Sequence, residues 1–170
     1  MNDRTLRGRA RLLGDDVNTD ALISSSRKKE SLDPQVLRRY LLEDLDPRFA
    51  ASVEEGDVLV AGRNFGCGSA MEVAVTVVLG AGIRAVVARS FSRTYWRNAI
   101  NNGLLAVVAD TTGIAEGQRL ELRLDGATPE LRVLADPVRT IACEALPEFM
   151  LAMRNAGGLV PYLRRHGKLA

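Results

Sequence analysis

Short apolar runs alternate with helix-like segments in the middle of the chain. Asp57–Ala61, Arg84–Ser90 and Leu104–Ala109 read as buried strands because they are almost continuously apolar. The segments between them, Val73–Gly82 and Ser92–Gly103, end in glycine, and Ser92 is a favourable residue to begin a helix. Strands joined through helices in this way predict parallel, adjacent strands.

The flanking segments predict an N-terminal strand and a more antiparallel C-terminal part. Leu6–Leu13 reads as a half-buried strand, and Asp33 followed by Pro34 predicts the start of a helix that reaches Leu45. Further expected elements are a polar turn at 14–20, a short strand or helical turn at 21–23, a solvated basic loop at 24–30, a hairpin of 119–124 with 131–134, a strand at 139–144, and helices at 147–155 and 159–165.

Length and charge restrict the class of protein. A chain of 170 residues with 46% hydrophobic residues is expected to form one globular domain over residues 1–170. The formal net charge of +2 does not indicate nucleic acid or a membrane surface as a partner, and no apolar run approaches the length of a membrane span. The N-terminus has no apolar signal core, so a cytoplasmic protein is expected.

The residues that most often bind metals or perform nucleophilic catalysis are scarce. The chain has two cysteines, Cys67 and Cys143, and one histidine, His166, near the C-terminus. Two cysteines are too few for a disulfide framework and too few to hold an iron–sulfur cluster or a structural zinc ion. If the protein takes part in catalysis, something outside the chain must supply part of the chemistry.

One glycine-rich stretch follows the first of the central strands. Its sequence is Gly-Arg-Asn-Phe-Gly-Cys-Gly-Ser-Ala-Met-Glu over residues 62–72. Glycines allow close approach by a ligand, and the N–H groups at a helix start favour anions, which Ser69 would meet. The stretch does not match a dinucleotide fingerprint, a P-loop or a nucleophile elbow. From spacing alone, an anion site and a plain tight turn remain equal alternatives.

Four motifs together resemble the small subunit of the isopropylmalate isomerase and homoaconitase family, which corresponds to the swivelling domain of aconitase. They occur in the family's order at 14–23, 62–69, 82–91 and 102–105, and so span most of the chain. The resemblance implies an α/β fold, namely a three-layer β/β/α swivelling domain with a partly parallel central sheet. It also implies a hydro-lyase that removes and re-adds water on a hydroxy di- or tricarboxylic acid.

The resemblance further implies a partner. A separate large subunit is expected to carry a [4Fe–4S] cluster through its own cysteines, with no cofactor bound by this chain. One iron of that cluster acts as a Lewis acid on the leaving hydroxyl. A small carboxylic acid is the expected substrate, no nucleic acid or membrane is expected as a partner, and the free chain is expected to be able to form a homo-oligomer.

The resemblance assigns roles within the glycine-rich stretch. Ser69 corresponds to the serine that takes the proton from the substrate carbon. The backbone N–H groups of residues 66–68 and the helix start could stabilise its alkoxide, and a packing role is favoured for Cys67. The residues expected to contact the substrate are Cys67, Gly68, Ala70, Met71 and, from another loop, Arg27. The family continues with serine and arginine where this chain has Ala70 and Met71.

The arginine that the family has at position 71 can bind a carboxylate through two parallel hydrogen bonds, which methionine cannot form. Either the substrate differs at this position or its carboxylate is held from elsewhere. Met71 is expected to face an apolar substrate group, since methionine fills irregular gaps. A basic cluster, Arg27, Lys28 and Lys29, occupies a loop that helps choose the substrate in the family. We hypothesise that Arg27, or one of the two lysines, replaces the lost cation; a solvated basic loop is the alternative.

Two functional alternatives stay open at this point. Isopropylmalate is the first candidate substrate, and dimethylmalate or homocitrate are close alternatives. The chain could instead be a non-catalytic paralogue that only binds a ligand or a large subunit. Retention of Ser69, Glu72 and the glycines argues against loss of the site. Glycine loses more chain entropy on folding than other residues, so a site without function has no reason to keep these glycines.

Overall fold

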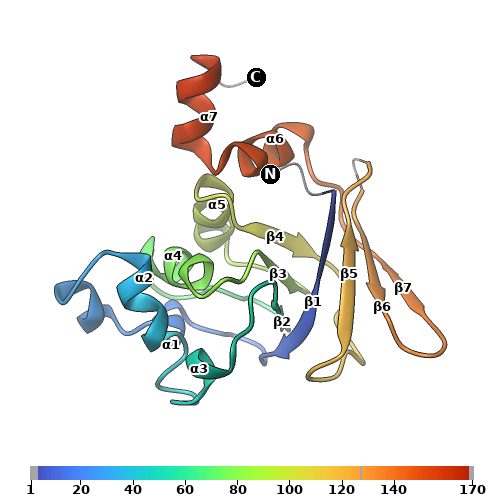
Figure 1. The fold of residues 1–170 in the computed structure, drawn as a ribbon, viewed down its shortest axis with the longest axis horizontal. Helices are drawn as coiled ribbons and strands as arrows, with labels where there is room; N and C mark the ends of the chain where they lie inside the picture. Colours follow the sequence, from blue (N-terminus) through green and yellow to red (C-terminus); the bar gives the residue numbers. More distant parts are fainter. Residues whose placement is uncertain (1–3, 127, 169–170) are drawn as a thin grey trace.

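A single mixed β-sheet forms the centre of the protein (Figure 1). The structure, a computed structural model, describes residues 4–126 and 128–168. Within them the strand order is β4-β3-β2-β1-β5-β6-β7. The strands are β1 (Thr5–Leu12), β2 (Val58–Ala61), β3 (Ala85–Ala88), β4 (Leu105–Val108), β5 (Arg119–Arg123), β6 (Glu130–Val133) and β7 (Arg139–Ala142). Strands β1 to β4 are parallel, whereas β5 pairs antiparallel with β1 and continues into the antiparallel pairs β5–β6 and β6–β7.

Helices α1 to α4 lie together on one side of the sheet, and α6 and α7 follow beyond α5 (Figure 1). The bounds are α1 (Thr19–Leu22), α2 (Pro34–Leu37), α3 (Phe49–Ser52), α4 (Val73–Gly80), α5 (Arg93–Asn101), α6 (Glu148–Ala156) and α7 (Leu159–His166), with 3-10 helices η1 (Ser25–Lys29) and η2 (Arg38–Tyr40). Among the described residues, no helix combines the length and apolar character needed to cross a membrane.

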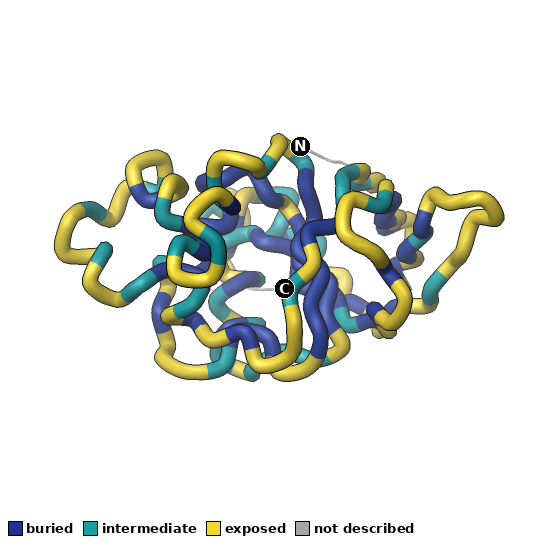
Figure 2. The backbone as a smooth tube through the Cα atoms, turned by 90° about the horizontal axis from the view of Figure 1, so that it is seen from below, coloured by how far each residue is buried: buried dark blue, intermediate teal, exposed yellow. Residues whose placement is uncertain are grey.

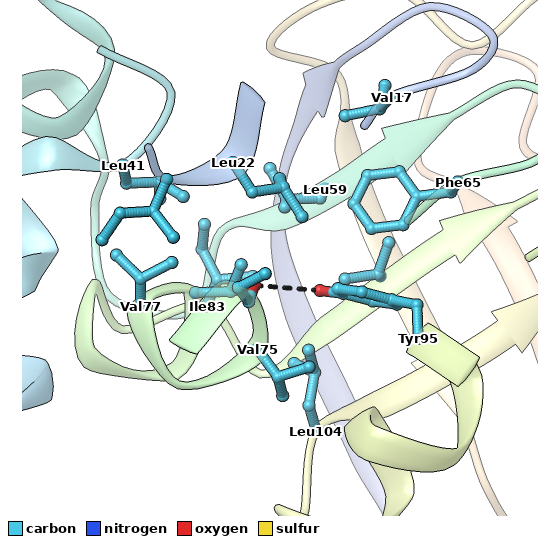
Figure 3. Close-up of a cluster of buried hydrophobic side chains, with 14 of the residues drawn as sticks. Val17, Leu22, Leu41, Leu59, Phe65, Val75, Val77, Ile83, Tyr95 and Leu104 are labelled. Carbon is cyan, nitrogen blue, oxygen red and sulfur yellow. Dashed lines mark hydrogen bonds between the residues drawn. The ribbon is translucent and has the colours of Figure 1, made fainter. Parts of the chain in front are cut away.

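The parallel strands are apolar on both sides because both of their faces are covered. All four residues of β2 and all four residues of β3 are buried, in the register Val58↔Ala85 to Ala61↔Ala88. One face packs against the helices in a cluster that includes Leu22, Phe65 and Tyr95 (Figure 3). Burial of apolar area on this scale is the main stabilising contribution to the fold.

The opposite face of the parallel strands packs against the antiparallel strands. This second cluster joins residues such as Val60 and Val87 of the parallel strands to Leu122 and Leu131 of β5 and β6. The order of layers is therefore antiparallel sheet, parallel sheet and helices. Buried backbone accordingly concentrates in the centre of the molecule, with exposed segments around it (Figure 2). The predicted α/β fold with a partly parallel sheet is confirmed.

The predicted strands and most of the predicted helices are confirmed, but the helix predicted from Pro34 to Leu45 is wrong. Asp33 caps α2 as expected, since its side chain accepts from Gln35 N. However, α2 ends at Leu37, and Leu42 has a positive φ of 58°. The backbone N–H of Leu42 donates to Leu22 O at 2.9 Å, so a tertiary hydrogen bond replaces the helical one.

The segment after α1 is more ordered than the solvated loop that its composition indicates. Ser24 accepts from Ser26 N and caps the 3-10 helix η1. The uncertain segment 21–23 belongs to a helical turn rather than a strand, because α1 covers Thr19–Leu22 and is capped by Asn18. Both short helices depend on side chains that bond to the nearby backbone, which is typical of Ser and Asn at helix starts.

Candidate functional site

The glycine-rich stretch forms a loop between β2 and α4, and the loop that follows β1 lies beside it. Gly66 N donates to Val17 O and Thr19 N donates to Cys67 O, each at 2.8 Å. These bonds form an isolated parallel bridge between Asn18 and Cys67 beyond the ends of the strands. The two loops therefore meet at the carboxyl edge of the parallel sheet, where ligand sites of α/β proteins commonly lie.

Two glycines in this loop occupy places that other residues would not fit. Gly66 has φ +77°, and a Cβ there would lie 2.2 Å from Cγ of Tyr95. Gly68 has φ +95°, and a Cβ there would lie 2.5 Å from Oδ1 of Asn18. Both the backbone conformation and the close neighbours require glycine. The sequence pattern thus reflects packing under the loop as well as access from above it.

The base of the loop is held by aromatic packing and by the start of α5. The Phe65 ring is fully buried and makes edge-to-face contacts with Phe91 and Tyr95, at centroid distances of 5.9 and 5.1 Å. Ser92 Oγ donates to Gly66 O at 2.6 Å. Side chains from the segment after β3 and from the start of α5 thereby fix the loop before it reaches Ser69.

Ser69 lies exposed on this support, with its carbonyl group fixed. Ser69 O accepts from Thr19 Oγ1 at 3.0 Å and from Met71 N at 2.9 Å. The four consecutive backbone N–H groups from Cys67 to Ala70 have no acceptor among the described residues. Unpaired consecutive N–H groups of this kind favour an anion. The arrangement can therefore bind a carboxylate or stabilise negative charge on the serine oxygen.

The helix that follows the loop begins too far along the chain for its first turn to form an anion site beside Ser69. α4 begins at Val73, and Glu72 at its N-cap position makes no capping hydrogen bond through its side chain. The donors beside Ser69 are thus loop N–H groups rather than the first turn of α4.

An ionic cluster fixes the other end of the loop. Asp15 accepts from Arg63 N at 2.7 Å and from the guanidinium groups of Arg63 and Arg89 at 3.3 and 3.2 Å. The backbone N–H of Arg63, followed by the two guanidinium groups, lowers the pKa of Asp15 below its usual range. Asp15 is therefore ionised near neutral pH and joins the loops that follow β1, β2 and β3.

The structure separates the other predicted site residues into two groups. Cys67 is half-buried and its Sγ contacts Asp16 O at 3.4 Å, whereas Ala70 is exposed beside Ser69. Met71 is only 5% exposed and packs in the cluster between the sheet and the helices. Gly68, Cys67, Ser69 and Ala70 thus share one surface, and the Met71 side chain is buried under it.

Arg27 is bound to carboxylates of its own region. Its guanidinium donates to Glu43 at 2.7 and 3.0 Å and to Glu30 at 2.6 Å. It also lies over the Tyr40 ring, 3.9 Å from the centroid. Arg27 therefore anchors η1 to η2 in this conformation, while Lys28 and Lys29 remain exposed.

The side chains of this chain do not fit an iron–sulfur cluster. The sequence has two cysteines, and clusters are usually held by more thiolates than that. Among the described residues, no three or more His, Cys, Asp or Glu side chains are grouped as a metal site would require.

Three contributors to the site were not identified from sequence. Asn18 lies against Gly68, Asp15 holds Arg63, and Ser92 holds Gly66. Asp15 and Asn18 lie in the N-terminal motif, and this motif was the sequence feature that could have pointed to them. The neighbouring residues in the sequence did not indicate which residues they contact. Thr19 also reaches the site, since its hydroxyl group donates to Ser69 O.

Comparison with known proteins gives consistent results over nearly the whole chain. A family model described as the aconitase C-terminal domain matches residues 40–112. A 3-isopropylmalate dehydratase small subunit 1 of Methanopyrus kandleri is 43% identical over 97% of this chain and 96% of its own length. A methanogen homoaconitase small subunit of Methanocaldococcus jannaschii is 42% identical over 94% of this chain and 92% of its own length.

This chain belongs to the 3-isopropylmalate dehydratase and homoaconitase small-subunit family. A crystal structure of 3-isopropylmalate dehydratase from Methanocaldococcus jannaschii matches it with a TM-score of 0.89 and 41% identity, covering 96% of this chain and 95% of that one. The expected resemblance, fold and class, a hydro-lyase small subunit, are confirmed. The comparisons do not favour the non-catalytic paralogue. A small subunit of this family has a larger partner subunit.

Proposed function

We propose that this small subunit completes the active site of a two-subunit hydro-lyase, in which Ser69 exchanges a proton with the substrate carbon. The observation that carries the proposal is the exposed Ser69 beside four backbone N–H groups that have no acceptor among the described residues. An unperturbed serine hydroxyl keeps its proton at neutral pH. Preorganised donors lower the cost of the alkoxide most when a partner surface excludes water.

The partner in this proposal is a large subunit that carries a [4Fe–4S] cluster. The donor set of this chain supports the assignment of the cluster to the partner, because two cysteines cannot hold one. The Ser69 loop is exposed at the carboxyl edge of the parallel strands, and the N–H groups of residues 67–70 have no acceptor among the described residues. A partner that covers this edge would enclose the substrate between the two subunits.

The substrate in this proposal is a hydroxy di- or tricarboxylic acid. The names of the relatives support this class: besides 3-isopropylmalate dehydratase and homoaconitase, an isopropylmalate/citramalate isomerase small subunit is 39% identical over 94% of this chain. 3-Isopropylmalate is the first candidate, with citramalate, dimethylmalate and homocitrate beside it. The N–H groups beside Ser69 are suited to one carboxylate of such an acid.

A second carboxylate needs another cation. Met71 cannot provide one, and its side chain is buried. Arg27 has three of its five N–H donors on Glu43 and Glu30, whereas Lys28 and Lys29 are exposed in the same segment. If Arg27 serves this role, Arg27→Ala lowers kcat/KM of the complex, and an unchanged kcat/KM would remove Arg27 from the site. The same measurement on Lys28→Ala and Lys29→Ala decides between the three cations.

The proposal is tested by reconstituting the chain with the large subunit from the same cells under anaerobic conditions. The complex is assayed for the unsaturated product from each candidate acid. Ser69→Ala is expected to abolish turnover while the complex still assembles. Ser31→Ala, which removes a hydroxyl outside the loop, serves as the matched control. Full turnover by Ser69→Ala, or no activity from an assembled iron-containing complex on any of these acids, would contradict the proposal.

A further inference from the structure

A pocket of about 280 Å³ lies at the carboxyl ends of β3 and β4, next to the start of α5. Its lining includes two arginines, one glutamate and three large apolar side chains: Arg89, Arg93, Glu144, Phe91, Trp96 and Leu146. It does not include Ser69 or any other residue of the loop at 62–72. Its volume is suited to a small metabolite rather than to a nucleotide or a peptide.

The charged side chains that line this pocket keep hydrogen-bonding groups that have no partner among the described residues. Arg93 and Glu144 are exposed, and neither side chain has a hydrogen bond or ion pair with any described residue. Arg89 uses one nitrogen on Asp15 at 3.2 Å, which leaves other donors of its guanidinium group. The pocket therefore presents two cations and one anion that are available to a ligand.

The apolar part of the pocket is held in place by the core. Leu146 is buried, and Phe91 and Trp96 are partly buried against the cluster between the sheet and the helices. Phe91 packs on Phe65, and the neighbouring Ser90 Oγ accepts from Asn64 N at 2.8 Å. A rigid apolar wall next to a few available charged groups is typical of small-molecule sites that exist before the ligand binds.

The combination of charges selects one class of ligand. A simple carboxylate would be attracted by the arginines but repelled by Glu144, and a simple amine would meet the reverse. A zwitterion satisfies both signs, and its side chain would lie on the indole of Trp96. We propose that this pocket binds a small α-amino acid with an apolar side chain. Arg93 and Arg89 take its carboxylate group, and Glu144 takes its ammonium group.

The lining of this pocket includes no residue of the Ser69 loop. A hydroxy acid brings no cation for Glu144. The inference does not depend on the proposed hydro-lyase function, because binding is measured on the small subunit alone. A failure of the amino-acid site is therefore distinguishable from a failure of the proposed hydro-lyase function.

Trp96 provides the readout, since it is the only tryptophan in the chain and lines the pocket. Its fluorescence is followed while the purified small subunit is titrated with leucine, methionine and phenylalanine. A saturable change is expected for these amino acids. 4-Methylpentanoate and 3-methylbutylamine, which each lack one charge of leucine, are expected to bind about tenfold more weakly or worse. Equal binding of either analogue, or no saturable change with any amino acid, would overturn the proposal.

Three variants test the geometry. Arg93→Gln and Glu144→Gln are each expected to weaken binding about tenfold or more, because each removes one charged hydrogen-bonding partner. Arg97→Gln is the matched control, since Arg97 is an exposed arginine of the same helix that does not line the pocket. Unchanged titrations in both pocket variants would overturn the proposal. So would a result in which they weaken only assembly with the large subunit, because the pocket would then be part of the subunit interface.

Discussion

Thr19 Oγ1 donates a hydrogen bond of 3.0 Å to the carbonyl oxygen of Ser69. The two residues are 50 positions apart: Thr19 is the first residue of α1, and Ser69 lies in the loop that follows β2. Thr19 is only 2% exposed, so its hydroxyl group is a fixed donor beneath an exposed serine. This bond sets the orientation of the peptide that presents the Ser69 side chain and the neighbouring N–H groups.

Thr19→Val removes that donor while keeping the shape of the side chain. Ser69 O keeps the hydrogen bond from Met71 N. The variant therefore loses one ordinary hydrogen bond, worth about 0.5–1.5 kcal/mol, and we expect kcat of the reconstituted complex to fall by about two- to tenfold. Thr19→Ser keeps the hydroxyl group and is expected to retain most of the activity. Steady-state kinetics check this, with thermal unfolding as the control for folding. Wild-type kcat in Thr19→Val would show that the bond does not position Ser69.

Gly66→Ala is expected to destabilise the protein. The added Cβ would lie 2.2 Å from the Tyr95 ring at a φ of +77°. The left-handed conformation costs about 1–2 kcal/mol and overpacking about 1–3 kcal/mol, so the free energy of unfolding should fall by about 2–5 kcal/mol. Gly117→Ala is the matched control, with the same φ of +77° and no atom within 4 Å of the added Cβ. Urea unfolding measures both, and equal losses would contradict the role of Tyr95.

Met71 is expected to act through packing. Met71→Leu conserves volume and should change the free energy of unfolding by less than about 1.5 kcal/mol, whereas Met71→Ala should lower it by about 2–5 kcal/mol. Because the side chain is 5% exposed, we expect Met71→Leu to leave KM unchanged. A large increase in KM without a change in unfolding would instead place the Met71 side chain against the substrate.

Glu121 is expected to make stability depend on acid pH. Its carboxylate accepts from Arg7, Arg123 and Arg132 at 2.7, 2.7 and 2.9 Å, and these contacts, Arg7 first, lower its pKa to about 2. A depressed pKa stabilises the fold fully above the ordinary glutamate pKa of 4.5, and this contribution declines as pH falls toward about 2.

The matched variants isolate that contribution. Glu121→Gln should have a lower urea midpoint than wild type at neutral pH, and the difference should shrink as the pH falls below the ordinary glutamate pKa. Glu130→Gln is the control, since the side chain of Glu130 is 47% exposed and lies 3.8 Å from Arg132. A difference that stays constant with pH would show that the charge of Glu121 does not contribute.

Local patterns were sufficient for the strands and for the helices with strong boundary residues. The runs that form β2, β3 and β4 are apolar because both of their faces are covered, and that pattern is visible without a structure. Ser92 and Gly103 mark α5, since a cap and a left-handed stop are local properties. The helix prediction was wrong after Leu37 because the backbone N–H of Leu42 donates to Leu22 O, and Leu22 lies far away in the sequence.

By itself, the sequence determined the alternation of strands and helices, the glycine-rich loop with Ser69, and the family motifs, because each of these resides in neighbouring residues. Only the tertiary structure decided which side chains serve the loop. Thr19 beneath Ser69, Tyr95 against Gly66, and the burial of Met71 depend on where separate segments pack. The same holds for the meeting of Arg93, Trp96 and Glu144 in one pocket. Side-chain contacts between distant segments arise from the packing of the whole core, and no local pattern encodes them.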